Sequence, residues 1–521
     1  MKKFYLCPEK LRFMNITISF RKNIFFYQCI AITALFFVLN ISQLVAQERP
    51  IYLNLDDVIA LAQERSPDAM INVHRFRRSY WEFRSFKAGY LPNVTLDATL
   101  PNFARTIEAI VQEDGTEKYR ERNISRYSAG LSVNQKVGWT GGTVYLRTGL
   151  QRSDNLTSGS SSTQYLSTPV SIGFTQPIFG YNAYKWDKKT EPMVYEEAER
   201  SFLESTEQVA ITAINHFFNL LIAQIERGIA LKNQSNYDTL FNIAKGRYVL
   251  GKIAENELLQ LELNLLQATS TVETADLNYQ NNLFTFKSYI RLITNSDIIL
   301  IPPTEISYFQ IDVSEAVSEA LSNSSSILSY ERQLIEAQSQ VSQAKFNGRF
   351  DATLNASFGL TQTAADLADV YKKPLDEEVV SLGISIPLID WGQARGQIRM
   401  AESNFDLVQA TIEQNRIDFE QNIFLKVMQF NMQKNQLMIA AKADTVAQKR
   451  YDVTQKRYMI GKVNDVLELN NAQIDNDNAK IRYFNALKTY WTNYYEVRKL
   501  TLFDFRTNQK LKFVPEDKIV R

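Results

Sequence analysis

The chain has 521 residues, about twice the usual length of a compact domain, so it can hold two or three domains or one long non-globular object. Its 58 basic and 57 acidic side chains nearly cancel and 45% of its residues are hydrophobic, which argues against disorder and against nucleic acid as a partner. It has only two histidines, and both cysteines, Cys7 and Cys29, lie near the N-terminus. We therefore expect no zinc site, no Cys-His or Ser-His nucleophile and no cofactor, although acid-base chemistry by carboxylates stays open.

The N-terminal segment has the order of a secretory signal peptide. Arg21 and Lys22 precede an apolar run from Cys29 to Leu39, and a cleavage-like stretch ends at Ala46. The apolar run is too short to cross a bilayer as a helix, so a signal peptide at residues 1–46 is favoured over a membrane anchor. Met14 is an alternative start, and the exact cleavage site is open. The mature chain is expected in the periplasm, outside the cell or in an outer membrane.

Two sequence blocks recur at the same distance. Val170 to Pro177 aligns with Val380 to Pro387, and Arg-Tyr-x-x-Gly-Lys occurs at Arg247 and again at Arg457. The offsets agree, since 387 − 177 = 210 and 457 − 247 = 210. This predicts an internal duplication, with a signal peptide at 1–46, repeat one at 47–301 and repeat two at 302–521.

Within each repeat the hydrophobic period changes from two to that of a helix. Apolar residues alternate with polar ones in four stretches, which predicts four strands with one apolar face: 94–100, 170–174, 350–360 and 380–386. Two further alternating stretches, 127–133 and 144–150, are either additional barrel strands or a folded extracellular flap, and the sequence does not separate these. The stretches 101–125, 152–167 and 361–376 are polar and predict solvated loops.

Long segments free of Gly and Pro, such as 397–460 and 462–514, predict helices far longer than those of a compact domain. In repeat one the corresponding segment contains Gly228 and Gly246, and Pro192 predicts a helix start or a kink. Each repeat is thus expected to run helix, strand, strand, long helix, tight turn, long helix.

The ordered motifs resemble the TolC-type outer membrane efflux proteins, also called outer membrane factors, from about Leu55 to Leu500. The motifs are the helix start at Leu55 with Ser66-Pro67 after it, Ala88 to Pro92 before the first strand, and the Gln-Pro and Ile-Pro strand ends, together with both Arg-Tyr-x-x-Gly turns. The resemblance implies an α+β membrane protein: a homotrimer in which four strands per copy form one twelve-stranded barrel. The helices would form a long coiled-coil barrel, a periplasmic tunnel that docks on an adaptor protein and an inner-membrane pump. Independently, four strands cannot close a barrel, and unpaired backbone groups are costly in lipid, so several copies must combine.

The two Arg-Tyr-x-x-Gly turns are candidate adaptor-docking tips by this resemblance. A positive φ at a helix end explains the glycines locally. It does not explain why Arg-Tyr precedes both turns. The candidate contact residues are Arg247, Tyr248, Gly251, Lys252, Arg457, Tyr458, Gly461 and Lys462.

Carboxylates just beyond the turns are candidates for a pore constriction. Asp465 and Glu468 are three residues apart, which places both on one helix face, and copies related by symmetry would arrange them as stacked acidic rings. The efflux family has an Asp-Val-Leu-Asp segment here, whereas this turn is two residues shorter and ends in Glu. Glu257 is the equivalent candidate in repeat one. The alternative for all three is an ordinary solvated face.

The sequence therefore favours a passive, non-enzymatic exit duct in the cell outer membrane, belonging to a tripartite efflux pump or a type I secretion system. Its expected partners are two further copies of itself, an adaptor, a pump and outer-membrane lipid. The main alternative is an exported coiled-coil scaffold without transport activity, which would not need the alternating strands. The substrate, whether a drug, another small molecule or a protein, and the class of pump served are not readable from the chain.

Overall fold

The computed structural model describes residues 50–157, 161–293, 296–303, 309–460 and 466–513. The predicted signal peptide lies outside these ranges. The chain divides into two units. In the small one, strand β1 (Ile51–Leu53) pairs with β6 (Ile298–Leu300), and the Ile51 N–H donates to the Asp297 carbonyl at 2.8 Å. The large unit holds the helices and the main sheet.

The elements of the first half run α2 (Leu55–Arg65), α3 (Pro67–Ala88), β2 (Asn93–Val111), β3 (Glu117–Val137), β4 (Gly142–Asn155), β5 (Ser162–Ile178), α4 (Ala183–Val249) and α5 (Glu255–Tyr289). Those of the second half run α6 (Val313–Asn323), α7 (Ser325–Asn347), β7 (Asp351–Ala364), β8 (Leu375–Ser385), α8 (Gln393–Met459) and α9 (Val466–Thr501), followed by the short strands β9 (Phe503–Asp504) and β10 (Gln509–Lys510). Helix lengths match between the halves: α4 and α8 both have 67 residues, and α5 and α9 have 35 and 36. The duplication itself stays a prediction from the sequence.

Local sequence sets the helix starts. Asn54 and Asp57 form a reciprocal capping box at α2, and the Ser66 hydroxyl accepts from the Ala69 N–H at 3.1 Å, with Pro67 in the first turn of α3. At α8, the Asp390 carboxylate accepts from the backbone N–H groups of Gly392 and Ala394. A carboxylate at a helix N-terminus satisfies donors that the helix itself leaves unpaired.

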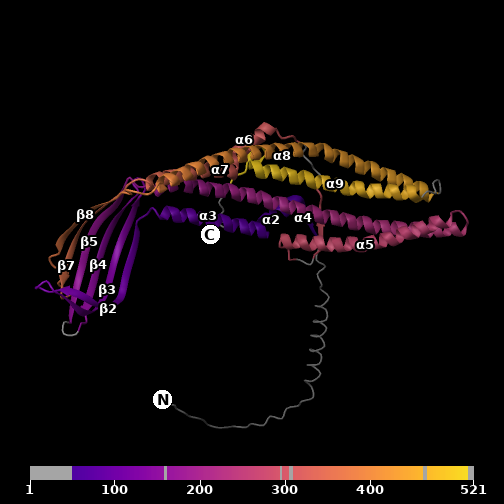
Figure 1. Ribbon diagram of the computed structural model, residues 1–521. Coiled ribbons are helices and arrows are strands. Elements are labelled where there is room, and N and C mark those ends of the chain that lie inside the picture. The colour runs from indigo at the N-terminus through magenta and orange to yellow at the C-terminus, as the bar shows by residue number, and fades with distance from the viewer. Residues whose placement is uncertain (1–49, 158–160, 294–295, 304–308, 461–465, 514–521) are drawn as a thin grey trace, which may run out of the picture. The chain divides into compact units, whose positions relative to one another are not determined.

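The long helices form two antiparallel hairpins, α4 with α5 and α8 with α9 (Figure 1). The hairpins also pack on each other, because α4 contacts α9. Near the turns their shared core consists of buried residues from all four helices: Tyr237, Leu240, Ala244, Leu261, Ala268, Tyr451, Tyr458, Val466, Leu469 and Ala472. The two halves therefore build one packed unit.

Pro192 lies inside α4, so the prediction of a helix start there is wrong: the helix begins at Ala183, where Asn182 caps it. Gly228 and Gly246 do not interrupt α4 either. Among the described helices, α4 alone has a stretch long and apolar enough to cross a membrane, but 56% of that stretch is buried inside the protein. Burial of this kind is that of a core helix.

The main sheet has six antiparallel strands in the order β2-β3-β4-β5-β7-β8 (Figure 1). The stretches 127–133 and 144–150 lie in β3 and β4, between β2 and β5. The sheet of this chain therefore has six strands, not the four per copy that the resemblance implies.

Much of the sequence expected to form loops is strand. β2 extends to Val111 and β3 begins at Glu117, so most of 101–125 is a hairpin. Most of 152–167 belongs to the ends of β4 and β5. The expected loop at 361–376 shrinks to 365–374. A period-two pattern needs one uninterrupted apolar face. The ends of β4 and β5 are mostly polar, and on β2 the face that carries Phe103, Ile107 and Val111 is interrupted by Arg105, so alternation did not reveal these strand ends.

Candidate functional site

The turn after α4 has the geometry expected of a helix end. The Lys252 N–H donates to the Arg247 carbonyl at 2.9 Å, and the Gly251 N–H donates to the Tyr248 carbonyl at 2.8 Å. These two bonds form a Schellman motif, which requires a left-handed residue, and Gly251 has φ = +67°. The positive φ expected at Gly251 is confirmed. In the second turn, Gly461, Lys462 and Asp465 lie outside the described residues.

The structure separates the six candidate docking residues that it describes by exposure. Tyr248, Lys252 and Arg457 are exposed, as are the apolar neighbours Val249 and Leu250. Tyr458 is different, since only 2% of it is exposed and it belongs to the core shared by the two hairpins. In this conformation its ring is not available to another protein.

Arg247 joins the two tips. Its guanidinium lies 5.4 Å from the centre of the Tyr458 ring and donates to the backbone carbonyls of Tyr458 and Met459, at 3.3 and 3.1 Å. These acceptors are the last carbonyls of α8, where the negative end of the helix dipole favours a cation. The recurring Arg-Tyr pair thus gains a structural role, since the arginine of the first turn packs on the tyrosine of the second.

The acidic candidates that are described lie near this junction. Glu257 is half-buried, and its Oε2 atom is shielded from solvent. Burial raises the pKa of the Tyr458 hydroxyl, and the negative charge of Glu257 raises it further. Glu468 is half-buried two residues into α9. Neither is a fully solvated side chain in a single copy. Whether they line a pore depends on the neighbouring copies and stays a proposal.

Farther along the hairpins, hydrogen-bonded polar pairs connect α4 to α8 and α9. Asn233 donates to the Asp477 carboxylate at 2.7 Å, the Tyr237 hydroxyl donates to Asn470 at 2.6 Å, and Asn236 donates to the Tyr451 hydroxyl. Burial raises the pKa of Asp477. No local sequence pattern predicts these hydrogen bonds, because the bonded residues are more than 200 positions apart in the chain.

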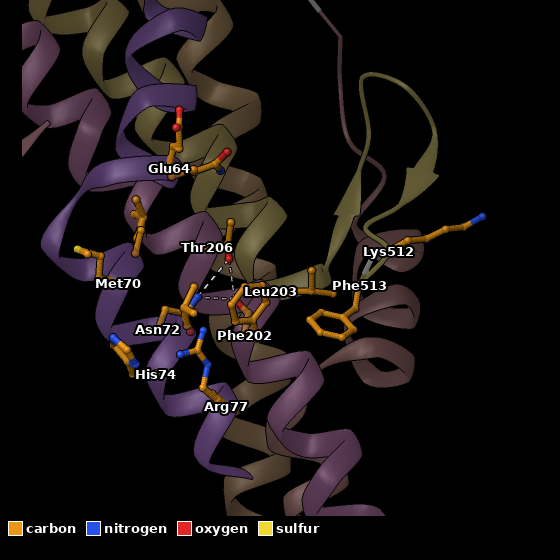
Figure 2. A pocket seen from close by; sticks show the side chains of 14 residues that line it. Glu64, Met70, Asn72, His74, Arg77, Phe202, Leu203, Thr206, Lys512 and Phe513 are labelled. Carbon is orange, nitrogen blue, oxygen red and sulfur yellow. Dashed lines mark hydrogen bonds between the residues drawn. The ribbon is translucent and has the colours of Figure 1, made fainter. Parts of the chain in front are cut away.

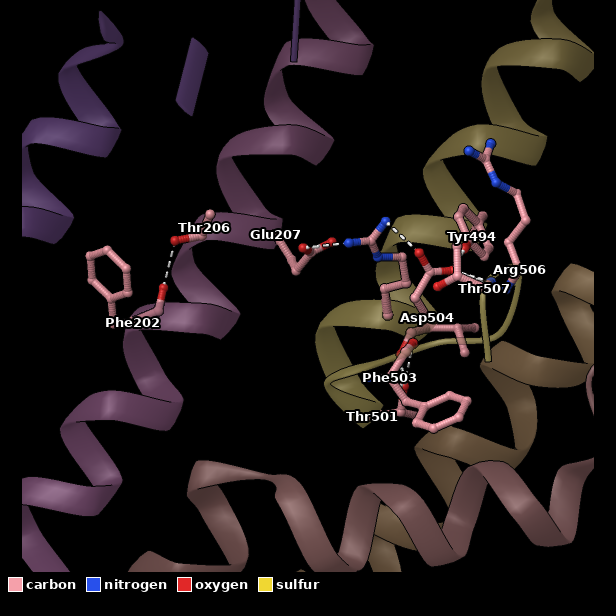
Figure 3. Close-up of polar contacts among 11 residues, drawn as sticks. Phe202, Thr206, Glu207, Tyr494, Thr501, Phe503, Asp504, Arg506 and Thr507 are labelled. Atoms are coloured by element: carbon pink, nitrogen blue, oxygen red, sulfur yellow. Dashed lines mark hydrogen bonds and ion pairs between the residues drawn. The ribbon is translucent and has the colours of Figure 1, made fainter. Parts of the chain in front are cut away.

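A buried charge network joins α4 to the end of α9 and to β9 (Figure 3). Arg498 donates to Glu207 at 3.0 Å and forms an ion pair with Asp504 at 3.5 Å, and the Tyr494 hydroxyl donates to Asp504. Burial raises the pKa of Glu207 to about 6, since its Oε2 atom has no hydrogen-bond partner among the described residues. No local pattern predicts this contact, because Glu207 and Arg498 are 291 positions apart in the chain.

A cavity of about 560 Å³ lies between α3, α4 and the C-terminal residues Lys512 and Phe513 (Figure 2). Within it the Asn72 carboxamide donates to the Phe202 carbonyl at 3.0 Å and to the Thr206 hydroxyl at 3.2 Å, so Asn72 connects α3 to α4. His74 lines this cavity, whereas the ring of His216 packs 4.6 Å from that of Tyr289. In the described part of the chain, no cluster of three or more His, Cys, Asp or Glu side chains could hold a metal ion.

The main sheet has one apolar and one polar face. Directly paired residues share a face, and one such row is apolar across five strands, with Val94, Val133, Leu146, Ile172 and Phe358, and ends at Glu378 on the edge strand β8. The next row on the opposite face crosses all six: Thr95, Ser132, Arg147, Ser171, Gly359 and Glu377. The apolar side chains are exposed in a single copy, for example Leu96 at 72% and Ile172 at 52%. An exposed apolar face opposite a polar one is the pattern of membrane-spanning barrels.

Both the sequence and the fold are similar to those of known outer-membrane proteins. Residues 316–501 match the family model of outer membrane efflux proteins. No curated protein matches the sequence. The fold is similar to the CmeC outer membrane channel of Campylobacter jejuni, with TM-score 0.61 and 16% identity over 86% of this chain and 85% of that chain. It is also similar to the outer-membrane channel OprN, with TM-score 0.62 and 16% identity over 86% and 89% of the two chains. The MtrE channel of Neisseria gonorrhoeae in its open state matches with TM-score 0.60 and 13% identity over 88% and 91%.

The fold is thus that of outer-membrane channels, with long helices attached to a β-sheet domain. The match of residues 316–501 to the efflux-protein family model and the fold shared with outer-membrane channels agree with the family and the outer-membrane localisation predicted from the motifs.

We predict that Glu207 makes the stability of the helical region depend on pH. Its folded-state pKa of about 6 exceeds the ordinary value of 4.5, so its contribution is fully present below pH 4.5 and is lost as the pH rises through 6. A shift of this size corresponds to about 2 kcal/mol. Unfolding by denaturant can be followed at several pH values by the helical circular-dichroism signal. In Glu207→Gln the slope of the unfolding free energy against pH should be mostly lost. The exposed control Glu196→Gln should keep it, and an unchanged slope in Glu207→Gln would contradict the assignment.

Proposed function

We propose that the protein is the passive exit duct of a tripartite efflux pump or type I secretion system. It would carry substrates from an inner-membrane transporter through the periplasm to the exterior, with the helices on the periplasmic side. The main observation is that the sheet has one exposed apolar face and one polar face. A coiled-coil scaffold would not need an exposed apolar face that extends across several strands. The match of residues 316–501 to the efflux-protein family model and the channel fold support the same conclusion.

The sheet also supports an oligomer. β2 and β8 are its edge strands, and an edge in hydrocarbon leaves backbone N–H and C=O groups without partners. Each such group costs several kcal/mol, so copies must close the sheet together. The family resemblance makes the number of copies three.

Assembly is tested by the mass of the mature protein in detergent. We expect a stable particle of three copies, because closure removes every edge. Inserted into planar bilayers it should conduct ions, and its gene should restore efflux or secretion to a strain that lacks it. A monodisperse monomer that stays in solution without detergent would contradict the proposal.

The tips of the helical hairpins are the proposed contact for the adaptor protein. Tyr248 and Lys252 are the accessible polar and aromatic groups of the described turn, next to exposed Val249 and Leu250. Tyr and apolar side chains rimmed by charge are the composition of protein-binding hot spots. Arg247 and Tyr458 would act indirectly, by holding the two tips together.

Tyr248→Ala combined with Lys252→Ala should weaken adaptor binding while leaving the oligomer intact. Truncating a hot-spot tyrosine costs about 2 kcal/mol, which is roughly a 30-fold loss in affinity. Binding to the purified adaptor and efflux in cells are the measurements. The exposed position Glu273→Ala, far from the tip on α5, is the control. Adaptor affinity equal to that of the parent would place the docking surface elsewhere.

Asp465 and Glu468, with Glu257 as the second choice, are the proposed acidic constriction. Carboxylates from three copies in a narrow passage would concentrate cations, with little screening where solvent is sparse. Glu468 and Glu257 lie close to the tips, and their partial burial supports a confined position.

Neutralising the pair with Asp465→Asn and Glu468→Gln should lower the preference for cations over anions. The reversal potential in bilayers under a salt gradient measures this, and Glu257→Gln tested alone separates the two sites. If the double variant keeps the parent's reversal potential and Glu257→Gln shifts it, the first repeat supplies the constriction. No shift in any variant would mean that none of the three carboxylates lines the constriction.

A further inference from the structure

We propose that the β3–β4 hairpin is part of the membrane wall, so that three copies close a barrel of 3 × 6 = 18 strands in which β8 of each copy pairs with β2 of the next. This rests on the proposed function, from which the number of copies is taken. The partner of each edge is a second copy of this chain. The proposal departs from the twelve-stranded barrel that the family resemblance implies.

The position of the β3–β4 turn shows that the hairpin reaches the side of the sheet where the helices begin. The turn, Gly138 to Gly141, is held by Asn182, the residue that caps α4: its carboxamide donates to the Gly138 carbonyl at 3.1 Å. From the neighbouring strand, Gln176 donates to the Thr140 carbonyl at 3.0 Å. The other ends of β3 and β4 lie at the opposite side of the sheet. A hairpin with its turn fixed here extends across the whole sheet and cannot be a flap on the outer side.

Charge is distributed along the hairpin as a membrane requires. On β3 the sequence has no charged residue between Arg126 and Lys136, and on β4 none between Gly142 and Arg152 except Arg147. Ten residue steps at about 3.3 Å span roughly 33 Å along a strand, enough for a tilted strand to cross the hydrocarbon core. Arg147 lies on the polar face, paired with Ser132 and Ser171.

The rims of this uncharged band carry aromatic side chains. Trp139 in the turn is 86% exposed, and Trp391, which follows β8, is 94% exposed. At the other rim Tyr127 and Tyr165 both pair with Arg152, on the same face as the apolar row. Tyr127 and Tyr165 are half-buried in a single copy. Aromatic residues at both borders of an apolar band are typical of a bilayer interface.

The edge strands fit each other. Six strands per copy is an even number, so β8 runs antiparallel to the β2 of a neighbouring copy. β8 carries Val380, Leu382 and Ile384 on the apolar face, and β2 carries Val94 and Leu96 on the same face, so the apolar surface continues across the junction. An eighteen-stranded barrel is of porin width and leaves an open aqueous channel. The barrel would then exert little selection, and the helical tips would limit conduction.

The test uses single-cysteine variants, which are unambiguous because Cys7 and Cys29 both lie in the predicted signal peptide. Leu131 and Ser132 are neighbours on β3 that face opposite sides of the sheet. In proteoliposomes, a spin label at Leu131→Cys should collide with oxygen dissolved in lipid and be shielded from a water-soluble nickel complex. A label at Ser132→Cys should show the reverse. A flap outside the bilayer would expose both labels to the nickel complex, and that result would overturn the proposal.

Edge pairing is tested by oxidation. Ser381→Cys on β8, combined in turn with Asn93→Cys, Thr95→Cys or Asp97→Cys on the polar face of β2, should give covalent oligomers for at least one pair. Ser381→Cys with Ser132→Cys, on an enclosed strand, is the matched control and should give none. Cross-linking in the control alone would refute the strand order.

The measured mass completes the strand count. Two copies would close twelve strands and four would close twenty-four, and either result would refute the eighteen-stranded barrel. If the protein is a conducting trimer but the label at Leu131 contacts water, the six-strand wall fails while the proposed duct function stands. If no conducting oligomer forms, the proposed function itself fails.

Discussion

The structure depends on one constraint: within a lipid bilayer, every backbone N–H and C=O group must find a partner in the protein. The six strands satisfy it internally through five antiparallel ladders, and leave it unmet along the outer sides of β2 and β8. A single copy is therefore an incomplete object. The exposed apolar face and the two open edges are both explained by neighbours and lipid that a single copy lacks.

The helical region follows a different rule, because water can solvate its outer faces and side chains must hold its long hairpins together. Aromatic and aliphatic residues fill the core near the tips, and hydrogen-bonded polar pairs such as Asn233 with Asp477 join α4 to α9. Arg498 does the same farther along, between Glu207 and Asp504. Removing one partner of such a buried pair leaves an uncompensated group, which is why these contacts fix how the helices pack.

The sequence predicted those elements whose pattern is local. Alternation marked the apolar-faced strands, the absence of Gly and Pro marked α8, and the Gly251 turn was expected with its positive φ. It did not reveal the ends of β2 and β3, where charged side chains such as Arg105 and Glu121, which form an ion pair, interrupt the apolar face. Nor could it tell that Tyr458 is buried, since which face of a helix meets a neighbour depends on tertiary packing. The resemblance misled on strand number because a family expectation does not include an inserted hairpin.

The placement of charge connects the sheet to the helices in one argument. Within the sheet Asp97, Arg147 and Glu377 lie on the polar face, where water can reach them in a closed barrel, and Glu378 of the edge strand β8 stands at the end of the apolar row. Beyond the rim, the β2–β3 hairpin carries exposed ion pairs such as Arg122 with Glu108 at 2.6 Å, which would be costly in hydrocarbon but cost little in water. At the helix tips the positive charges have two environments. Arg247 donates hydrogen bonds to backbone carbonyls of α8, whereas Lys252 and Arg457 are exposed. The duct hypothesis explains all three patterns, because one chain then meets lipid, external water and a protein partner in turn along its length.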